Sequence, residues 1–206
     1  MKLLPVAAAL AIFTAAPAFA GTPFLIDFEK SWQYGTTVDN TYAAAGVSFT
    51  NVLGLSNNDG LGNLPNGNYY ANAPSPLGVA FAQLDGVVNT AAYMNVASGA
   101  DNALSFYYSS ASSITGAVKA YSGLNGSGTL LGSFNLAATD DAFSVWAPVT
   151  FAFSGTAKSF DLSASANVVA FDNISAVPEP ATFALLLSGL GLMAFIARRR
   201  KQKQAD

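Results

Sequence analysis

Short stretches in which apolar and polar residues alternate recur about every ten residues through the middle of this chain. In Leu104–Ser109 every second residue is Leu, Phe or Tyr, and Val149–Phe153 repeats the pattern. Because successive side chains of a β-strand point to opposite faces, a period of two predicts strands with one buried face. No long stretch of this region has the 3.6-residue period of a helix. The middle of the chain is therefore predicted to be an all-β sandwich.

Turn-forming residues separate the expected strands. Asn125–Gly128 predicts a hairpin loop, and residues 55–76 form a long stretch rich in Asn, Gly and Pro that is typical of a functional or mobile loop. Ten strands are expected, at Phe24–Glu29, Gly46–Val52, Leu77–Gln83, Ala91–Val96, Ala103–Ser109, Ala117–Ser122, Thr129–Asn135, Val145–Phe153, Ala157–Leu162 and Val168–Ile174. The sequence does not give their pairing order.

The last thirty residues have a different pattern. A Pro-Glu-Pro triplet precedes an uncharged apolar run, Ala181–Ala197, and a basic cluster follows this run. As a helix, the 17 residues of the run would span about 26 Å, near the lower limit for crossing the core of a bilayer. The basic cluster keeps its end of such a helix in the cytoplasm, so the rest of the chain is placed outside. One alternative is a plain single-pass anchor. The other is a buried core helix, which is less favoured because such a helix does not need a basic cluster at its end.

This order of triplet, apolar run and arginine cluster resembles the PEP-CTERM sorting signal of exported proteins from Gram-negative bacteria that make extracellular polysaccharide. The resemblance spans residues 177–201 and implies cleavage near the triplet by a membrane-embedded exosortase. It implies a transient transmembrane helix at residues 181–197 and a cytoplasmic tail at residues 202–206. The implied sorting motif is Val177, Pro178, Glu179 and Pro180, and the implied basic stop-transfer cluster is Arg198, Arg199, Arg200 and Lys201.

The N-terminus has the pattern of a secretory signal peptide. Lys2 precedes an apolar stretch, and Ala18-Phe19-Ala20 is a small-x-small cleavage site before Gly21. A permanent N-terminal membrane helix is less favoured, because the apolar stretch is short and broken by prolines. We expect the general secretion machinery to export the chain across the inner membrane and signal peptidase to remove residues 1–20. The ectodomain is then residues 21–176, long enough for one domain with a core.

The composition of this ectodomain excludes several function classes. Three lysines stand against ten acidic residues, a net charge of −7, so binding to nucleic acid through phosphates is not expected. The chain contains no Cys and no His, which removes cysteine nucleophiles, histidine bases and the usual zinc ligands. Paired carboxylates remain, but Asp140 and Asp141 are chain neighbours and do not flank a substrate bond. We therefore expect no enzyme.

A second resemblance covers most of the ectodomain. The domain opens with Ile26–Glu29 and closes with Phe171–Ile174, and Gly46–Phe49, Val118–Gly123 and Phe151–Ala157 stand between them. These segments are similar to jelly-roll ectodomains of proteins with this sorting tail and to β-sandwich carbohydrate-binding modules. The full expectation is a jelly-roll-like β-sandwich with an N-terminal signal peptide and one C-terminal transmembrane helix.

The same resemblance implies that the first and last strands lie close together and that a structural Ca²⁺ ties them. Asp27 and Glu29 share one face of the first strand, Asp172 could supply a third carboxylate, and Asn173 a carbonyl. Ca²⁺ takes six to eight oxygen ligands, so backbone carbonyls and water would complete the shell. The alternative is that these are solvated carboxylates at a strand edge. Asn57, Asn58 and Asp59 lack the spacing of a calcium loop and favour a turn.

Aromatic residues are the candidate glycan-binding groups, since their faces stack on sugar rings. The candidates are Trp32, Tyr34, Tyr69 and Tyr70, and for each the alternative is packing in the core. Trp146 lies in an alternating run and is expected in the core. The prediction is an exported, non-catalytic surface or matrix protein, associated with exopolysaccharide and biofilm. The alternative is a carbohydrate-binding module with a specific glycan, and an enzyme that uses paired carboxylates is a third class.

Overall fold

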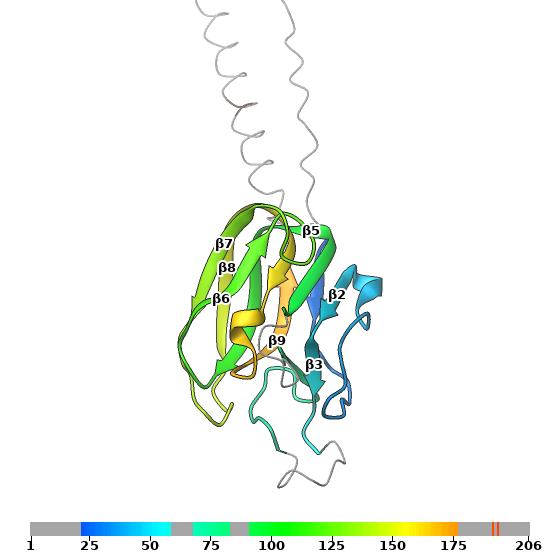
Figure 1. The fold of residues 1–206 in the computed structure, drawn as a ribbon, viewed down its shortest axis with the longest axis vertical. Helices are drawn as coiled ribbons and strands as arrows, with labels where there is room; N and C mark the ends of the chain where they lie inside the picture. Colours follow the sequence, from blue (N-terminus) through cyan, green and yellow to red (C-terminus); the bar gives the residue numbers. More distant parts are fainter. Residues whose placement is uncertain (1–21, 59–67, 83–90, 177–190, 192, 194–206) are drawn as a thin grey trace, which may run out of the picture.

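The computed structural model describes residues 22–58, 68–82 and 91–176, together with Gly191 and Met193. Within these ranges the chain is all-β, as expected, and nine strands form one antiparallel sheet (Figure 1). The strands are β1 (Phe24–Ile26), β2 (Val47–Thr50), β3 (Val52–Leu55), β4 (Val79–Ala82), β5 (Tyr93–Ser110), β6 (Ile114–Tyr121), β7 (Leu130–Leu136), β8 (Ala147–Asp161) and β9 (Val169–Ala176). Two 3₁₀ turns, η1 (Ala43–Ala45) and η3 (Ser163–Ser165), accompany them. The jelly-roll topology stays a prediction.

Strands β5 and β8 are longer than the sequence predicted, because each joins two expected strands into one. The register between them shifts after Asn95 and again after Asp101, which is the mark of β-bulges. The backbone has positive φ angles at Gly99 (86°), Asn102 (62°) and Gly155 (90°), so the apolar alternation breaks there while strand pairing continues. The sequence pattern therefore predicted a break in each strand at positions where the strand only bends.

The sheet has the order β3-β4-β9-β5-β8-β6-β7, with β1 added beside β9 and β2 beside β5. The first and last strands lie side by side, with Phe24 opposite Ala176 and Ile26 opposite Ile174 (Figure 1). The closeness of these two strands, which the resemblance implied, is confirmed.

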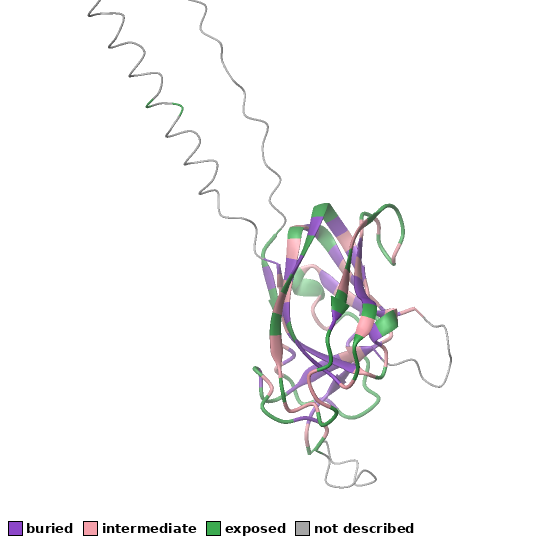
Figure 2. Cartoon of the chain, turned by 90° about the vertical axis from the view of Figure 1, so that its left-hand side faces the viewer, coloured by how far each residue is buried: buried purple, intermediate pink, exposed green. Residues whose placement is uncertain are grey.

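The main core consists of buried apolar residues from all nine strands and from the loops beside them. Figure 2 colours the buried residues along the strands purple. Its largest fully buried members include Phe28, Phe151, Phe160 and Phe171. Phenylalanine rings meet edge to face, for example Phe106 and Phe171 with centroids 5.6 Å apart. Truncating one such ring to Ala costs about 3–5 kcal/mol in typical cores.

A second, smaller cluster lies apart from the main core and is formed by Leu55, Tyr70, Val79 and Ala170. Two loops meet beside it: the backbone N–H of Ala71 donates to the carbonyl of Phe143 at 3.1 Å. Two further hydrogen bonds join the loops: Trp146 Nε1 donates to the Ala71 carbonyl at 2.9 Å, and Asn72 Nδ2 donates to the Ser144 carbonyl at 3.2 Å. Within the second loop, Ser144 Oγ donates to Asp140 Oδ2 at 2.6 Å. This cluster and its two loops position the candidate site.

None of the helices in the described ranges is both long and apolar enough to cross a membrane. The expected signal peptide, the sorting motif, the basic cluster and the tail lie outside the described residues, as does the expected transmembrane helix apart from Gly191 and Met193.

Candidate functional site

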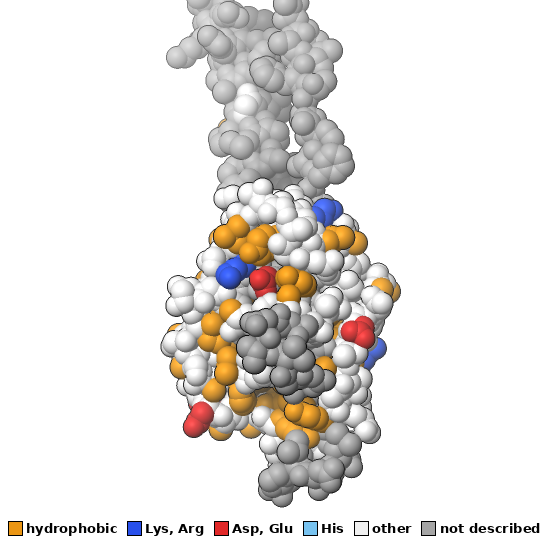
Figure 3. Space-filling view, in the orientation of Figure 1, with side chains coloured by type: hydrophobic (Ala, Val, Ile, Leu, Met, Phe, Trp, Pro, Cys, Tyr) orange, Lys and Arg blue, Asp and Glu red, His pale blue; other side chains and the backbone are white. Residues whose placement is uncertain are grey.

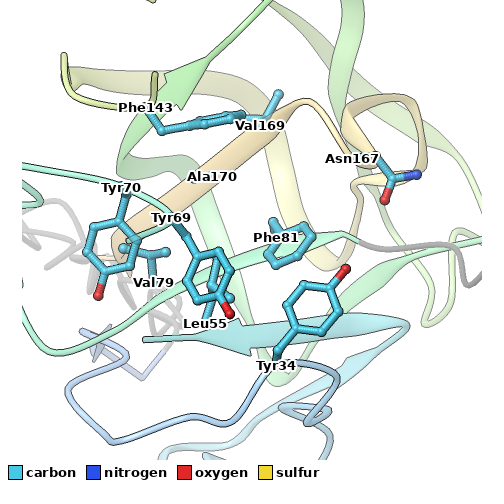
Figure 4. A pocket seen from close by; sticks show the side chains of 10 residues that line it. All are labelled: Tyr34, Leu55, Tyr69, Tyr70, Val79, Phe81, Phe143, Asn167, Val169 and Ala170. Atoms are coloured by element: carbon cyan, nitrogen blue, oxygen red, sulfur yellow. The ribbon is translucent and has the colours of Figure 1, made fainter. Parts of the chain in front are cut away.

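The candidate ligand site is a pocket of about 170 Å³ on the outer side of strands β3, β4 and β9. Loops far apart in the sequence complete it (Figure 4). Its lining residues are Tyr34, Leu55, Tyr69, Tyr70, Val79, Phe81, Phe143, Asn167, Val169 and Ala170. Three of the four aromatic residues that the sequence offered as glycan ligands therefore meet in one place.

Tyr34 and Tyr69 form a stacked pair in this pocket, with ring centroids 5.9 Å apart and ring planes 26° apart (Figure 4). Tyr34 is 39% exposed, so its ring is accessible from solvent. Asn57 fixes the position of Tyr69, because its Oδ1 accepts the backbone N–H of Tyr69 at 2.7 Å. Its Nδ2 also donates to the Tyr70 carbonyl at 2.9 Å. Asn57, expected as a turn residue, thus anchors the tyrosine loop to the end of β3.

Tyr70 is buried and serves as a wall of the pocket. Its hydroxyl donates to the Pro76 carbonyl at 3.3 Å, and its ring meets Trp146 edge to face at 6.4 Å. Burial raises the pKa of Tyr70 to about 12, so its phenol stays neutral at physiological pH. Trp146 is partly buried and packs against the small cluster rather than within the main core.

Trp32 is not among the residues that line this pocket, and it packs in the main core, which is the alternative that the sequence left open. The residue is only 5% exposed, and its Nε1 donates to the Phe28 carbonyl at 2.9 Å. Its indole lies against Gly54 and Gly78, where an added Cβ would come within 2.1 Å and 2.7 Å of ring atoms. A side chain at either glycine would clash with the indole, which is packed against the backbone at these positions. The buried ring is therefore not accessible to a ligand.

Three residues that line the pocket were not predicted as site residues from the sequence, namely Phe81, Phe143 and Asn167. Phe81 points to the opposite face of β4 from buried Ala80 and Ala82. Because both faces of that strand are apolar, its sequence gives no sign of a pocket. Phe143 and Asn167 lie in loops with φ angles of 51° and 65°. Asn is enriched at such angles and Phe is not, so the type of residue gave no sign of this conformation at Phe143.

Three of the four residues expected to bind Ca²⁺, namely Glu29, Asp172 and Asn173, accept hydrogen bonds from one short segment, residues 75–77. Asp172 is fully buried, and its Oδ2 accepts the backbone N–H of Ser75 at 2.7 Å. Glu29 Oε1 accepts the backbone N–H of Leu77 at 2.8 Å, and Ser75 Oγ donates to Asn173 Oδ1 at 2.9 Å. Side chains from the beginning and the end of the domain therefore hold the same segment.

Burial raises the pKa of the Asp172 carboxyl to about 7, although hydrogen bonds from Ser75 and Asn173 act in the opposite direction. Near it, the buried hydroxyl of Tyr42 makes no well-formed hydrogen bond within the described residues. Burial raises the pKa of Tyr42 to about 12, and the negative charge of Asp27 adds to this. This is a buried, oxygen-rich environment in which a negative charge is poorly compensated.

The donor chemistry of this region fits Ca²⁺, a hard cation that prefers carboxylate and carbonyl oxygens. Within the part of the chain that the structure describes, no group of three or more Asp, Glu, His or Cys side chains is placed to hold a metal ion. Calcium binding by Asp27, Glu29, Asp172 and Asn173 stays a prediction.

Other carboxylates of the described chain have structural partners. Asp140 accepts the backbone N–H groups of Ser144 and Val145, and hydrogen bonding from Ser144 holds its pKa below the usual value. Asp161 accepts from the backbone and hydroxyl of Ser163. On the face shown in Figure 3 few Lys, Asp and Glu side chains are visible, and acidic ones lie close to basic ones at the upper left and at the right edge.

The chain carries a C-terminal sorting motif directly after this domain. The family model described as the PEP-CTERM protein-sorting motif matches residues 176–201, so the match begins at the last residue of β9. The chain is therefore a PEP-CTERM motif-containing protein. The motif implies export, processing by exosortase and sorting to the cell surface in Gram-negative bacteria.

The solved structures that resemble the chain include two cleaved adhesin domains of Lys-gingipain. The K2 domain is 16% identical and aligns with a TM-score of 0.46, covering 75% of this chain and 99% of that one. The K1 domain, from Porphyromonas gingivalis W83, is 14% identical and aligns with a TM-score of 0.48, covering 77% and 99%. No curated protein matches the chain.

Proposed function

We propose that this chain is a non-catalytic protein of the cell surface or extracellular matrix, released by exosortase and associated with extracellular polysaccharide. The sorting motif at residues 176–201 is the observation that carries the proposal. It follows β9 without a linker, so cleavage near Val177–Pro180 leaves the β-domain whole. The composition supports a non-catalytic role, because the chain has no Cys or His.

Processing tests this proposal directly. The full chain is expressed in a Gram-negative host with its exosortase and in the same host without it, and the protein is followed by fractionation and immunoblotting. We expect a shortened product at the surface in the first host and a full-length, membrane-retained chain in the second. Replacing both Pro178 and Pro180 by Ala should have the effect of removing the enzyme. Thr115→Ala, at an exposed position of β6 outside the motif, is the control. Identical products in both hosts would refute the proposal.

The second candidate function is binding of a specific glycan in the tyrosine-lined pocket. The stacked pair of Tyr34 and Tyr69 is the observation that favours it, because aromatic faces exposed in a concave site suit the apolar face of a sugar ring. Retention of the protein on immobilised polysaccharide from the host tests this function. Tyr34→Ala and Tyr69→Ala should reduce retention at least about tenfold. Tyr107→Ala, which removes a tyrosine of similar exposure outside the pocket, should leave it unchanged.

Calcium has a structural role in this proposal. Bound between Asp27, Glu29, Asp172 and Asn173, it would neutralise the buried charge of Asp172 and join the ends of the domain through residues 75–77. None of these four residues lines the pocket, so the ion would not contact a ligand bound there.

A further inference from the structure

The size of the pocket limits what enters it. Its volume of about 170 Å³ is below the roughly 300–1,000 Å³ of pockets that enclose drug-sized ligands. There is room for a single sugar ring or part of one, and no room for several rings of a polysaccharide chain. A glycan therefore enters by its end or by a side branch.

The charge of the pocket limits its ligand further. None of its ten lining residues is charged. An acidic or amino sugar would leave its charge without a partner against apolar walls, which is strongly unfavourable. The part of the ligand that enters is therefore neutral.

The walls are more apolar than an ordinary hexose requires. Six lining side chains carry no polar atom, namely Leu55, Val79, Phe81, Phe143, Val169 and Ala170. The hydroxyl of Tyr70 is used by the Pro76 carbonyl. A sugar hydroxyl pressed against these walls would lose its water partners and gain none.

The polar groups of the pocket gather on one side. Figure 4 shows the hydroxyls of Tyr34 and Tyr69 and the amide of Asn167 toward the lower and right-hand side of the view, while Phe143 and Val169 lie at the top. A ligand that fits this division has hydroxyls at one end and an apolar substituent at the other.

From these observations we infer that the pocket recognises one terminal, neutral sugar residue that carries a methyl or acetyl group, such as a 6-deoxy or N-acetyl sugar. The apolar group packs against the partly exposed rings of Phe81 and Phe143, and the ring hydroxyls meet Tyr34 and Asn167. This inference rests on the proposed glycan binding and specifies its ligand class.

Matched pairs of free sugars test it. D-fucose differs from D-galactose only by lacking the 6-hydroxyl, and N-acetyl-D-glucosamine differs from D-glucose by its acetamido group; D-glucuronic acid is the charged control. Binding to the full chain in a non-glycosidic detergent is measured by ligand-observed NMR and calorimetry. In at least one pair, the methyl- or acetyl-bearing sugar should bind about tenfold tighter than its partner, and glucuronic acid should not bind.

Three variants locate the effect within the pocket. Phe143→Tyr keeps the ring but adds a hydroxyl, so it should reduce the preference within the pair. Tyr34→Phe keeps the ring and removes its hydroxyl, and Asn167→Gly removes the amide while tolerating the φ of 65°; both variants should weaken the binding of both sugars to the same extent. Unchanged thermal unfolding establishes that each variant is folded, and if Phe143→Tyr does not fold, weaker binding by Tyr34→Phe still places the sugar in this pocket.

The outcomes separate this inference from the proposed function. If the protein is retained on polysaccharide through Tyr34 and Tyr69 but no pair shows a preference, or glucuronic acid binds as well, the inference is wrong and glycan binding remains. If neither polysaccharide nor any free sugar binds, both are wrong.

Discussion

Phe24, at the start of β1, pairs with Ala176, the last residue of β9 and the first residue matched by the sorting motif. Because the N-terminal strand holds the strand that precedes the motif, the two ends of the domain depend on each other. The pairing of β1 with β9 lies directly before the expected cleavage site, and no linker separates the domain from that site.

Ile26→Ala should destabilise the domain through this pairing. Ile26 is fully buried opposite Ile174, and removing its side chain should cost about 2–4 kcal/mol of unfolding free energy. Leu25→Ala, at a neighbouring position that is 59% exposed, should change it by less than about 0.5 kcal/mol. Chemical denaturation measures both, and equal effects would contradict the role given to β1.

Trp32→Phe should lower stability without affecting glycan retention. The change removes the hydrogen bond to the buried Phe28 carbonyl and part of the packing against Gly54, at a cost of about 1–3 kcal/mol. Tyr34→Ala should show the opposite pattern, with weaker retention and little loss of stability. If Trp32→Phe abolished retention and left the unfolding free energy intact, Trp32 would belong to the site after all.

Asp172 should make the calcium-free domain less stable as the pH rises. Its pKa is about 7 in the folded chain against 3.8 for the free group, so between these values the folded state binds the proton more tightly than the unfolded state. The stabilisation is complete below about pH 4 and is lost as the pH rises through 7, with an upper bound of about 4 kcal/mol. Unfolding in EGTA at pH 5 and pH 8 measures this, and Asp172→Asn should flatten the dependence. A domain more stable at pH 8 in EGTA, with an unaltered profile in Asp172→Asn, would contradict it.

Calcium should reverse this loss. At a concentration 100 times its Kd, Ca²⁺ would add about 2.7 kcal/mol, which corresponds to roughly 5–10 °C in Tm for a domain of this size. The increase should be larger at pH 8 than at pH 5 and should disappear in Asp172→Asn. A Tm that does not respond to EGTA or to added Ca²⁺ would show that the domain has no structural calcium site.

The sequence predicted the fold where local pattern and burial agree. Leu104, Phe106 and Tyr108 are buried as their alternation indicated, the expected strand at 103–109 lies within β5, and residues 147–153 of the one expected at 145–153 lie within β8. The length of these two strands was not predicted, because Gly99 and Asn102 interrupt the apolar alternation at β-bulges. Strand pairing continues on both sides of these bulges. Long-range pairing decides such cases.

The candidate site was predicted in part, for a related reason. Tyr34, Tyr69 and Tyr70 were recognisable by residue type, but burial against Gly54 and Gly78 removes Trp32 from the set. The remaining walls come from β4, β9 and the loops that carry Phe143 and Asn167, and contacts between distant segments bring them together. Residue type finds candidates, and only the fold shows which of them meet.

Mass spectrometry of both termini of the protein recovered from the cell surface tests the central claim most directly. We predict a chain that begins near Gly21 and ends near the Val177–Pro180 motif when the host has its exosortase. A surface protein that retains the basic cluster and runs through to Asp206 would contradict it.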